Sequence, residues 1–368
     1  MKLNGIFFII MIFIVLLANT YVFYSLQKTI PLKFVKIIFL SAQILSFLMF
    51  VVSFLFRESL NPTLTNIFFK IGTTYVFIFL YLIVICAIKD IICLTPLTFK
   101  KYLTSNWYCF AGIFIFITTL FSIGYVNYLH KKRVEITINI TKTMNADKTL
   151  KIVGISDLHL GYNINKKEFS EWVETINNEN PDLIIIAGDI IDNSVKPLFE
   201  QNFAEVFKKF KTKFGIYAVL GNHDYHCKYA DVKRFFADAD ITLLQDSVAL
   251  INNNFYIIGR DDKTNRKRLN IRELCNNLDT TKLTILLDHQ PFNLNEAEEN
   301  HIDFQFSGHT HNGQLYPIKW LTDFMYEKSY GFLKKGETSF YISSGIGIWG
   351  GKYRLGSKSE YVVIQLKQ

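Results

Sequence analysis

The chain has few charged residues for its length. Only 20% of its 368 residues are Asp, Glu, Lys or Arg. Acidic residues are scarcest in residues 1–133, which contain two, Glu58 and Asp90, against twelve Lys and Arg. The rest of the chain holds 30 acidic and 28 basic side chains and is nearly neutral. The net charge of +8 therefore does not indicate a nucleic-acid partner, because the positive excess lies among apolar segments.

Cysteine is also scarce, and its spacing excludes two classes of protein. The five cysteines are Cys86, Cys93, Cys109, Cys227 and Cys275. No two of them have the close, repeated spacing of a disulfide framework or a thiolate zinc site. Because half of the residues are hydrophobic, the composition also excludes a disordered or collagen-like chain.

Four long apolar runs occupy the N-terminal part, at residues 6–26, 34–56, 67–88 and 107–129. A helix needs about 20 residues to cross a bilayer. The alternative, a buried helical core in a soluble protein, is disfavoured because the runs have no polar face. The first run also lacks a small-x-small cleavage site, so we interpret it as a retained helix rather than a signal peptide. The sequence predicts a four-helix transmembrane region over residues 1–133.

The orientation of these helices is poorly determined. Lys and Arg are divided six against six between the two sides, and only the run His130-Lys131-Lys132-Arg133 favours a cytoplasmic C-terminal domain. The helix centres contain no ionisable residue, which disfavours a transporter.

From about Val134 the sequence alternates between β-rich and polar helical segments, which predicts an α/β domain over residues 134–368. The expected strands are 150–155, 183–187, 215–220, 255–259, 283–287, 304–307, 339–343 and 361–366. The expected helices are 165–178, 197–211, 231–238, 271–277 and 293–300.

Five of the expected strands end in Asp, Asn or His, where the ligand sites of open α/β sheets lie. The donors are Asp157, His159, Asp189, Asn222, His289, His309 and His311. Any one of them alone is compatible with an ordinary turn, but together they form an oxygen and nitrogen set that suits Mn, Fe or Zn. Seven donors are too many for one tetrahedral ion and fit two ions that share a carboxylate. The pattern predicts a dimetal site for phosphoester hydrolysis.

These residues stand in five ordered motifs, which are Asp157-Leu158-His159, Gly188-Asp189, Gly221-Asn222-His223-Asp224, His289 and Gly308-His309-Thr310-His311. In this order they resemble the calcineurin-like metallophosphoesterase superfamily, over residues 148–368. The resemblance implies a four-layer α/β/β/α sandwich. The flanking residues, including Arg354-Leu355-Gly356, look like the membrane-associated bacterial branch, some members of which hydrolyse UDP-diacylglucosamine or other lipid-linked phosphoesters. This branch implies a multi-pass protein of the bacterial inner membrane.

The resemblance also implies a role for each residue. One divalent ion, Mn first among the candidates, is expected on Asp157, His159, Asp189 and His311. A second is expected on Asp189, Asn222, His289 and His309, with a bridging water as the nucleophile. His223 is expected over the phosphate and Asp224 behind it as an orienting residue. We interpret Asp192 and His226 as turn and surface residues, and His130 and His301 as ordinary solvent-facing or interfacial histidines.

Two questions stay open in the sequence. The aromatic and Lys-rich segment 315–332 either dips into lipid headgroups or packs its aromatics on the sheet. The expected partners are membrane lipids and a phosphoester substrate, with no indication of oligomeric state. A lipid-linked phosphoester or pyrophosphate is the first substrate hypothesis, a nucleotide or general phosphodiester is the second, and a non-catalytic membrane scaffold is the third.

Overall fold

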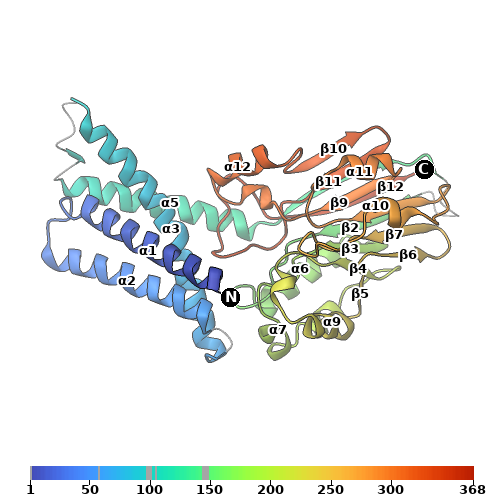
Figure 1. Ribbon diagram of the computed structural model, residues 1–368, viewed down its shortest axis with the longest axis horizontal. Helices are drawn as coiled ribbons and strands as arrows, with labels where there is room; N and C mark the ends of the chain where they lie inside the picture. Colours follow the sequence, from blue (N-terminus) through green and yellow to red (C-terminus); the bar gives the residue numbers. More distant parts are fainter. Residues whose placement is uncertain (1, 57–58, 97–101, 104–105, 143–148) are drawn as a thin grey trace. The chain divides into compact units, whose positions relative to one another are not determined.

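The structure is a computed structural model that describes residues 2–56, 59–96, 102–103, 106–142 and 149–368. Side chains are described from residue 10 onward, with residue 11 excepted. The chain divides into two compact units, Met1–Ile123 and Gly124–Gln368. The elements of both units are labelled in Figure 1.

The first unit consists of long helices. They are α1 (Lys2–Leu26), α2 (Lys33–Leu55), α3 (Pro62–Leu94) and α5 (Trp107–Leu129), whose last residues belong to the second unit. By length and composition, α2, α3 and α5 are each able to cross a membrane. In α1 the described apolar part is Ile12–Leu26, which is shorter than a span. The structure therefore supports three of the four predicted spans.

Helix α3 is longer than the predicted run at both ends. Asn61 caps it by accepting a hydrogen bond from the backbone of Thr63, and Pro62 occupies its first turn, where no intrahelical donor is needed. Its later part contains Lys89, which is buried and donates to the carbonyl oxygen of Ser25 in α1 at 2.9 Å. Lys89 also pairs with Asp90 at 2.7 Å, so its charge is balanced within the helical unit.

The second unit contains two six-stranded mixed sheets. The first has the order β1-β12-β2-β3-β4-β5 and the second β10-β11-β9-β8-β7-β6. The strands of the first sheet are β1 (Lys132–Asn139), β2 (Thr149–Ile155), β3 (Leu183–Ala187), β4 (Ile216–Val219), β5 (Ile241–Leu243) and β12 (Glu360–Lys367). Those of the second are β6 (Ser247–Ile251), β7 (Phe255–Gly259), β8 (Leu283–Leu287), β9 (Phe304–Ser307), β10 (Gly331–Lys335) and β11 (Thr338–Ile342).

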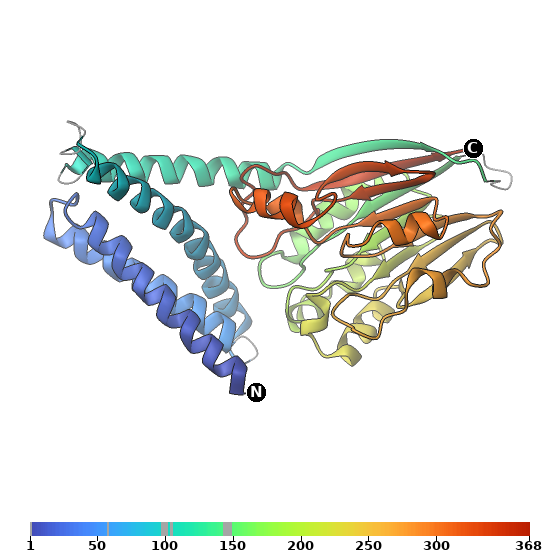
Figure 2. The same ribbon diagram turned by 45° about the horizontal axis from the view of Figure 1, so that its top comes forward.

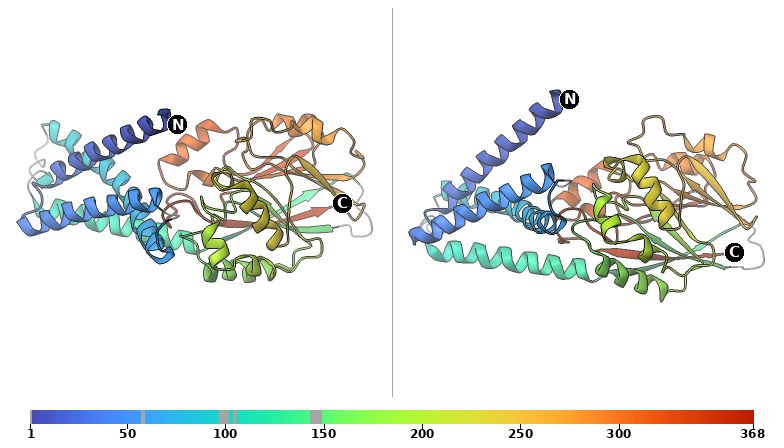
Figure 3. Two further views of the ribbon diagram at one scale, coloured as in Figure 1. Left: turned by 60° about the horizontal axis from the view of Figure 1, so that its bottom comes forward. Right: turned by 90° about the horizontal axis from the view of Figure 1, so that it is seen from below.

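The two sheets pack face to face, and helices cover their outer faces (Figures 2 and 3). One apolar cluster, with Ile185, Ile257 and Phe306, fills the space between the sheets. The outer face of the first sheet is covered by α6 (Lys166–Asn177), α7 (Lys196–Glu200), α8 (Ala204–Phe207) and α9 (Tyr229–Asp238). The outer face of the second is covered by α10 (Ile271–Cys275) and α11 (Asn295–Glu299). A short helix, α12 (Ile318–Met325), follows β9 and the 3-10 turn His311–Gly313.

The strands expected from fully apolar runs lie where the sequence predicts them. The half-exposed strands β1, β5, β6 and β10 and the helix α12 were not predicted. Strands β1 and β10 have at most two consecutive apolar residues, whereas β6 was missed although residues 248–251 form an apolar run. The expected helix 197–211 is broken into α7 and α8 at Asn202, whose φ of 52° does not continue a right-handed helix.

The end of α5 is part of the core of the second unit. Tyr128 is fully buried in the cluster between the first sheet and its helices, and its hydroxyl donates to Glu168. The Lys131 ammonium lies 3.5 Å from the centre of the Tyr128 ring. Only His130 and Lys131 separate α5 from β1, so the helix enters the domain without a linker.

Candidate metal centre

The predicted donors meet where the carboxyl ends of strands from both sheets lie side by side. Strands β2, β3 and β4 of the first sheet lead to Asp157, Asp189 and Asn222. Strands β8 and β9 of the second sheet lead to His289 and to the loop of His309 and His311. The two sheets thus supply the carboxylates and most of the imidazoles from opposite sides.

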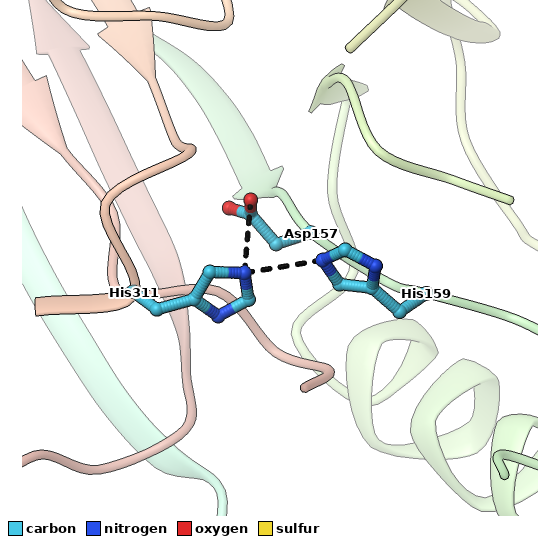
Figure 4. A group of neighbouring side chains, drawn as sticks. All are labelled: Asp157, His159 and His311. Atoms are coloured by element: carbon cyan, nitrogen blue, oxygen red, sulfur yellow. Dashed lines mark hydrogen bonds and ion pairs between the residues drawn. The ribbon is translucent and has the colours of Figure 1, made fainter. Parts of the chain in front are cut away.

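One group of possible ligands consists of Asp157, His159 and His311, all of which are buried (Figure 4). The Nε2 atoms of His159 and His311 are 3.1 Å apart, and His311 Nε2 is 3.4 Å from Asp157 Oδ1. Burial, with Arg354 nearby, lowers the pKa of His311 well below its ordinary value, which leaves its ring neutral. A neutral imidazole nitrogen that faces a second ring nitrogen and a carboxylate oxygen is arranged to bind a cation.

A second group consists of Asp189, His289 and His309. His289 donates from Nδ1 to the carbonyl oxygen of Ala187 at 2.7 Å, which fixes its ring and turns Nε2 toward the site. That Nε2 lies 3.3 Å from Asp189 Oδ2 and 3.3 Å from Asn222 Oδ1. Burial, with His289 nearby, lowers the pKa of His309 to about 4, so this ring too is a neutral donor.

Asp189 lies between the two groups. Its Oδ2 is 3.3 Å from His289 Nε2 and 3.7 Å from His159 Nε2, while its Oδ1 accepts from the backbone N–H of His223 at 2.8 Å. Burial raises the pKa of Asp189, but the hydrogen bond and the charges of the surrounding imidazoles, His289 first among them, together outweigh burial and hold the pKa well below its ordinary value. The carboxylate is therefore ionised and positioned to serve both groups.

The motif glycines leave room for the carboxylates. A Cβ on Gly221 would stand 2.1 Å from Asp189 Oδ1, and one on Gly308 would stand 2.4 Å from Asp157 Oδ2. Five of the predicted ligands also have left-handed backbone conformations; they are Asp157, His159, Asp189, His309 and His311, with φ from 46° to 70°. Such conformations cost about 1–3 kcal/mol each and are concentrated at functional sites.

The carboxylate that contacts the His223 ring is not the one that the sequence predicts. Its Nδ1 is 3.1 Å from Asp192 Oδ1, and the same oxygen is 3.5 Å from His159 Nδ1. Asp224, predicted to orient His223, instead accepts backbone hydrogen bonds from Ile191 and Gly221, both at 2.8 Å. Asp224 thus fixes the backbone of the loop through its hydrogen bonds, whereas the buried Asp192 orients the His223 ring.

The remaining histidines lie outside the two groups. His130, His226 and His301 are exposed, although the His226 ring is centred 5.6 Å from that of His223. Their positions agree with the interpretation of these residues as surface histidines. The exposure of Asp192, at 7%, does not agree with its interpretation as a turn residue of the surface.

Arg354 is a further residue of the site; the sequence showed it only in a flanking motif, with no role at the metal centre. Its side chain is completely buried, and burial lowers its pKa to about 10, so it stays protonated at neutral pH. It donates to the carbonyl oxygen of His311 at 2.8 Å and to those of Ser344 and Gly347 at 2.7 and 2.8 Å. The guanidinium thus fixes the backbone of one predicted ligand.

The donors fit divalent cations. They are carboxylate oxygens and imidazole nitrogens without thiolates, all but the half-buried His309 are buried, and the two groups are joined by Asp189. Such a site is able to hold two ions that share a carboxylate and to neutralise an anionic phosphate.

Comparison with known proteins agrees with this chemistry. The calcineurin-like phosphoesterase family profile matches residues 150–313. An uncharacterized metallophosphoesterase of Campylobacter jejuni is 30% identical over 376 residues, covering 98% of this chain and 99% of that protein. A transmembrane protein with metallophosphoesterase domain from Danio rerio is 31% identical over 255 residues, covering 64% of this chain and 57% of that protein. A 5'-nucleotidase precursor from Thermus thermophilus is similar with a TM-score of 0.36 and 14% identity, over 60% of this chain and 54% of that one.

The chain belongs to the calcineurin-like metallophosphoesterase family. It is a metal-dependent phosphoester hydrolase, and its family uses a dimetal centre. Its long apolar helices and the transmembrane relative support membrane association.

The contact between Asp192 and His223 leads to a test with two leaving groups. Replacing Asp192 by Asn removes the charge that holds the protonated ring, so we expect turnover to fall by about 10- to 100-fold. The loss is expected to be larger for a phenyl than for a p-nitrophenyl phosphodiester, because the poorer leaving group depends more on proton donation. Equal losses for both substrates would contradict a role through His223. Asp238→Asn, at an exposed ion pair, is the control.

The contacts of Arg354 lead to a second test. In Arg354→Lys one ammonium cannot satisfy all the carbonyl oxygens that the guanidinium binds, and each buried unsatisfied group costs about 1–3 kcal/mol. We expect lower thermal stability and a smaller content of bound metal, measured by elemental analysis of the purified full-length protein. Arg272→Lys, at an exposed position, is the control. A full metal content in Arg354→Lys would show that the guanidinium does not position His311.

Proposed function

We propose that this chain is a membrane-bound dimetal phosphoesterase that cleaves a phosphoester or pyrophosphate bond of a lipid-linked substrate. The observation that carries the proposal is the convergence of the two donor groups on the buried Asp189, in a chain that also contains apolar helices long enough to span a bilayer.

The first ion would be held by Asp157, His159, Asp189 and His311, and the second by Asp189, Asn222, His289 and His309. When bound, two divalent cations supply an activated water and neutralise the charge of the phosphate. Mn is our first candidate because the donors are oxygen and nitrogen; the same donors accept Fe or Zn.

His223 is the proposed catalytic side chain. It is the more open member of its cluster, with 24% of its side chain exposed, against 6% for Asp192. Burial lowers its pKa, but the Asp192 hydrogen bond and the charge of Asp189 outweigh burial and raise the pKa to about 9. The ring is therefore protonated at neutral pH. With Nδ1 bound to Asp192, the proton on Nε2 is available to a phosphate oxygen or to the leaving oxygen.

The proposal for the membrane region is based on the four apolar runs of the sequence. We propose that residues 1–133 form a four-helix transmembrane region, with α1 as the fourth span, and residues 134–368 form the catalytic four-layer domain. A bacterial inner membrane with the catalytic domain in the cytoplasm is the proposed location, supported by the basic residues Lys131, Lys132 and Arg133 after α5.

Loss of catalysis without loss of metal tests the role of His223. We expect His223→Ala to lower the hydrolysis of bis(p-nitrophenyl) phosphate by about 100-fold or more, because the charged ring that would donate to a phosphate oxygen, as well as to the leaving oxygen, is removed. Bound metal is expected to stay at the level of the unaltered protein. His301→Ala is the matched control at an exposed histidine. Retained activity in His223→Ala would remove His223 from the mechanism.

A substrate panel tests the lipid-linked class. In proteoliposomes we expect UDP-linked lipids to be hydrolysed in preference to glycerophosphodiesters and free nucleotides. A preference for free nucleotides would favour the second hypothesis, a membrane-anchored nucleotide phosphodiesterase. An absence of hydrolysis with every substrate and every metal would favour a scaffold.

A further inference from the structure

Helix α12 has an apolar face that no part of the described chain covers. Trp320, Leu321, Phe324 and Met325 are 68%, 56%, 88% and 53% exposed. Residues at this spacing share one side of a helix. No residue of the helix is buried. Four large apolar side chains exposed together on one helix indicate a binding surface, because water-facing helices normally place polar residues there.

The rest of the aromatic segment behaves differently. Tyr326 is buried, and the Tyr330 hydroxyl donates to Glu360 inside the domain at 2.7 Å. Phe332 is 43% exposed, but the other two aromatics after α12 pack on the domain, as one of the two sequence interpretations expects. Those of α12 itself do not, so its apolar face needs another occupant.

Helix α12 is firmly attached to the loop of the metal centre. Lys319 donates to Asn312, the residue after His311, at 2.9 Å. A Cβ on Gly313 would stand 2.3 Å from the Cα of Lys319, so the two backbones are in direct contact. The position of α12 is therefore tied to the position of the site.

The residues Arg354 and Leu355 lie between the end of α5 and the segment that leads into α12, all within the same unit. The carbonyl oxygen of Gly124 accepts from the backbone of Arg354 at 2.9 Å, and Asn127 donates to the carbonyl oxygen of Arg354 at 3.2 Å. The next residue, Leu355, accepts from the backbone of Tyr316 at 2.9 Å. One short segment thus joins the end of an apolar helix to the start of α12.

We propose that the apolar face of α12 lies in the headgroup layer of the bilayer that α5 crosses. The occupant is a lipid surface, because α5 enters the domain without a linker beside the segment that starts α12. An interfacial helix of this kind buries its apolar side about 5–10 Å into the boundary of headgroups and acyl chains. The Trp320 and Tyr316 rings, with centroids 5.9 Å apart, have the amphipathic character typical of that layer.

The proposed contact of α12 with the lipid headgroups goes beyond the proposed activity, because it requires no particular substrate. Its consequence is that the His309–His311 loop lies next to the lipid surface, where a phosphate attached to a lipid is found. The contact and the hydrolysis are measured separately in the following experiment.

The test is tryptophan quenching by brominated phospholipids, with full-length protein in proteoliposomes. The chain has four Trp, so the Trp320 contribution is the difference between the unaltered protein and Trp320→Phe. We expect this contribution to be quenched more strongly by lipids brominated near the headgroup than by lipids brominated near the bilayer centre. The double variant Leu321→Ser with Phe324→Ser is expected to lose the quenching. It is expected to keep its hydrolysis of soluble bis(p-nitrophenyl) phosphate.

The matched control is Leu250→Ser in β6, which is 45% exposed and is expected to leave both measurements unchanged. Quenching of Trp320 by aqueous acrylamide but not by any brominated lipid would overturn the proposal, since the face would then lie in water. Protection of Trp320 from both quenchers would also overturn it, because a second copy or another protein would then cover the helix.

Discussion

The carboxylate of Asp189 is the group on which the rest of the site depends. It is almost completely buried, and a buried charge is tolerated only when opposite charge and hydrogen-bond donors surround it. His289 and His159 approach one oxygen, and the backbone of His223 donates to the other. Gly221 has no side chain because a Cβ there would collide with this carboxylate. The residue types at His159, Gly221 and His289 are thus each explained by the buried charge of Asp189.

That requirement also explains why the centre needs two sheets. Asp189 follows β3 in the first sheet, whereas His289 follows β8 in the second. The apolar cluster between the sheets, where Phe306 closely approaches Gly154, brings the two strand ends together. Cation binding and sheet packing are therefore coupled, because cations that bind the folded site stabilise the arrangement that creates it.

The sequence indicated the possible metal ligands more clearly than the residues that orient them. Asp157 and Asp189 follow β2 and β3, whose apolar runs end just before a carboxylate, so the sequence placed both side chains at strand ends. Local sequence did not distinguish Asp192 from Asp224 as the partner of His223, since both lie near it and only the fold turns one carboxylate toward the ring. Arg354 is 43 positions from His311, and no local pattern connects them. Strand β5 has only three residues, and β6 is only partly buried although residues 248–251 form an apolar run; neither was predicted.

Arg354 connects the end of α5 to the loop of the metal centre. Its backbone binds Gly124 and Asn127 in α5, and its guanidinium binds the carbonyl oxygen of His311. A displacement of the end of α5 would therefore be transmitted to a proposed metal ligand through a single residue whose side chain is completely buried. Because such a side chain has little freedom to rearrange, the contact acts as a rigid connection. In the proposed membrane arrangement, packed residues rather than a flexible linker would set the distance of the centre from the lipid surface.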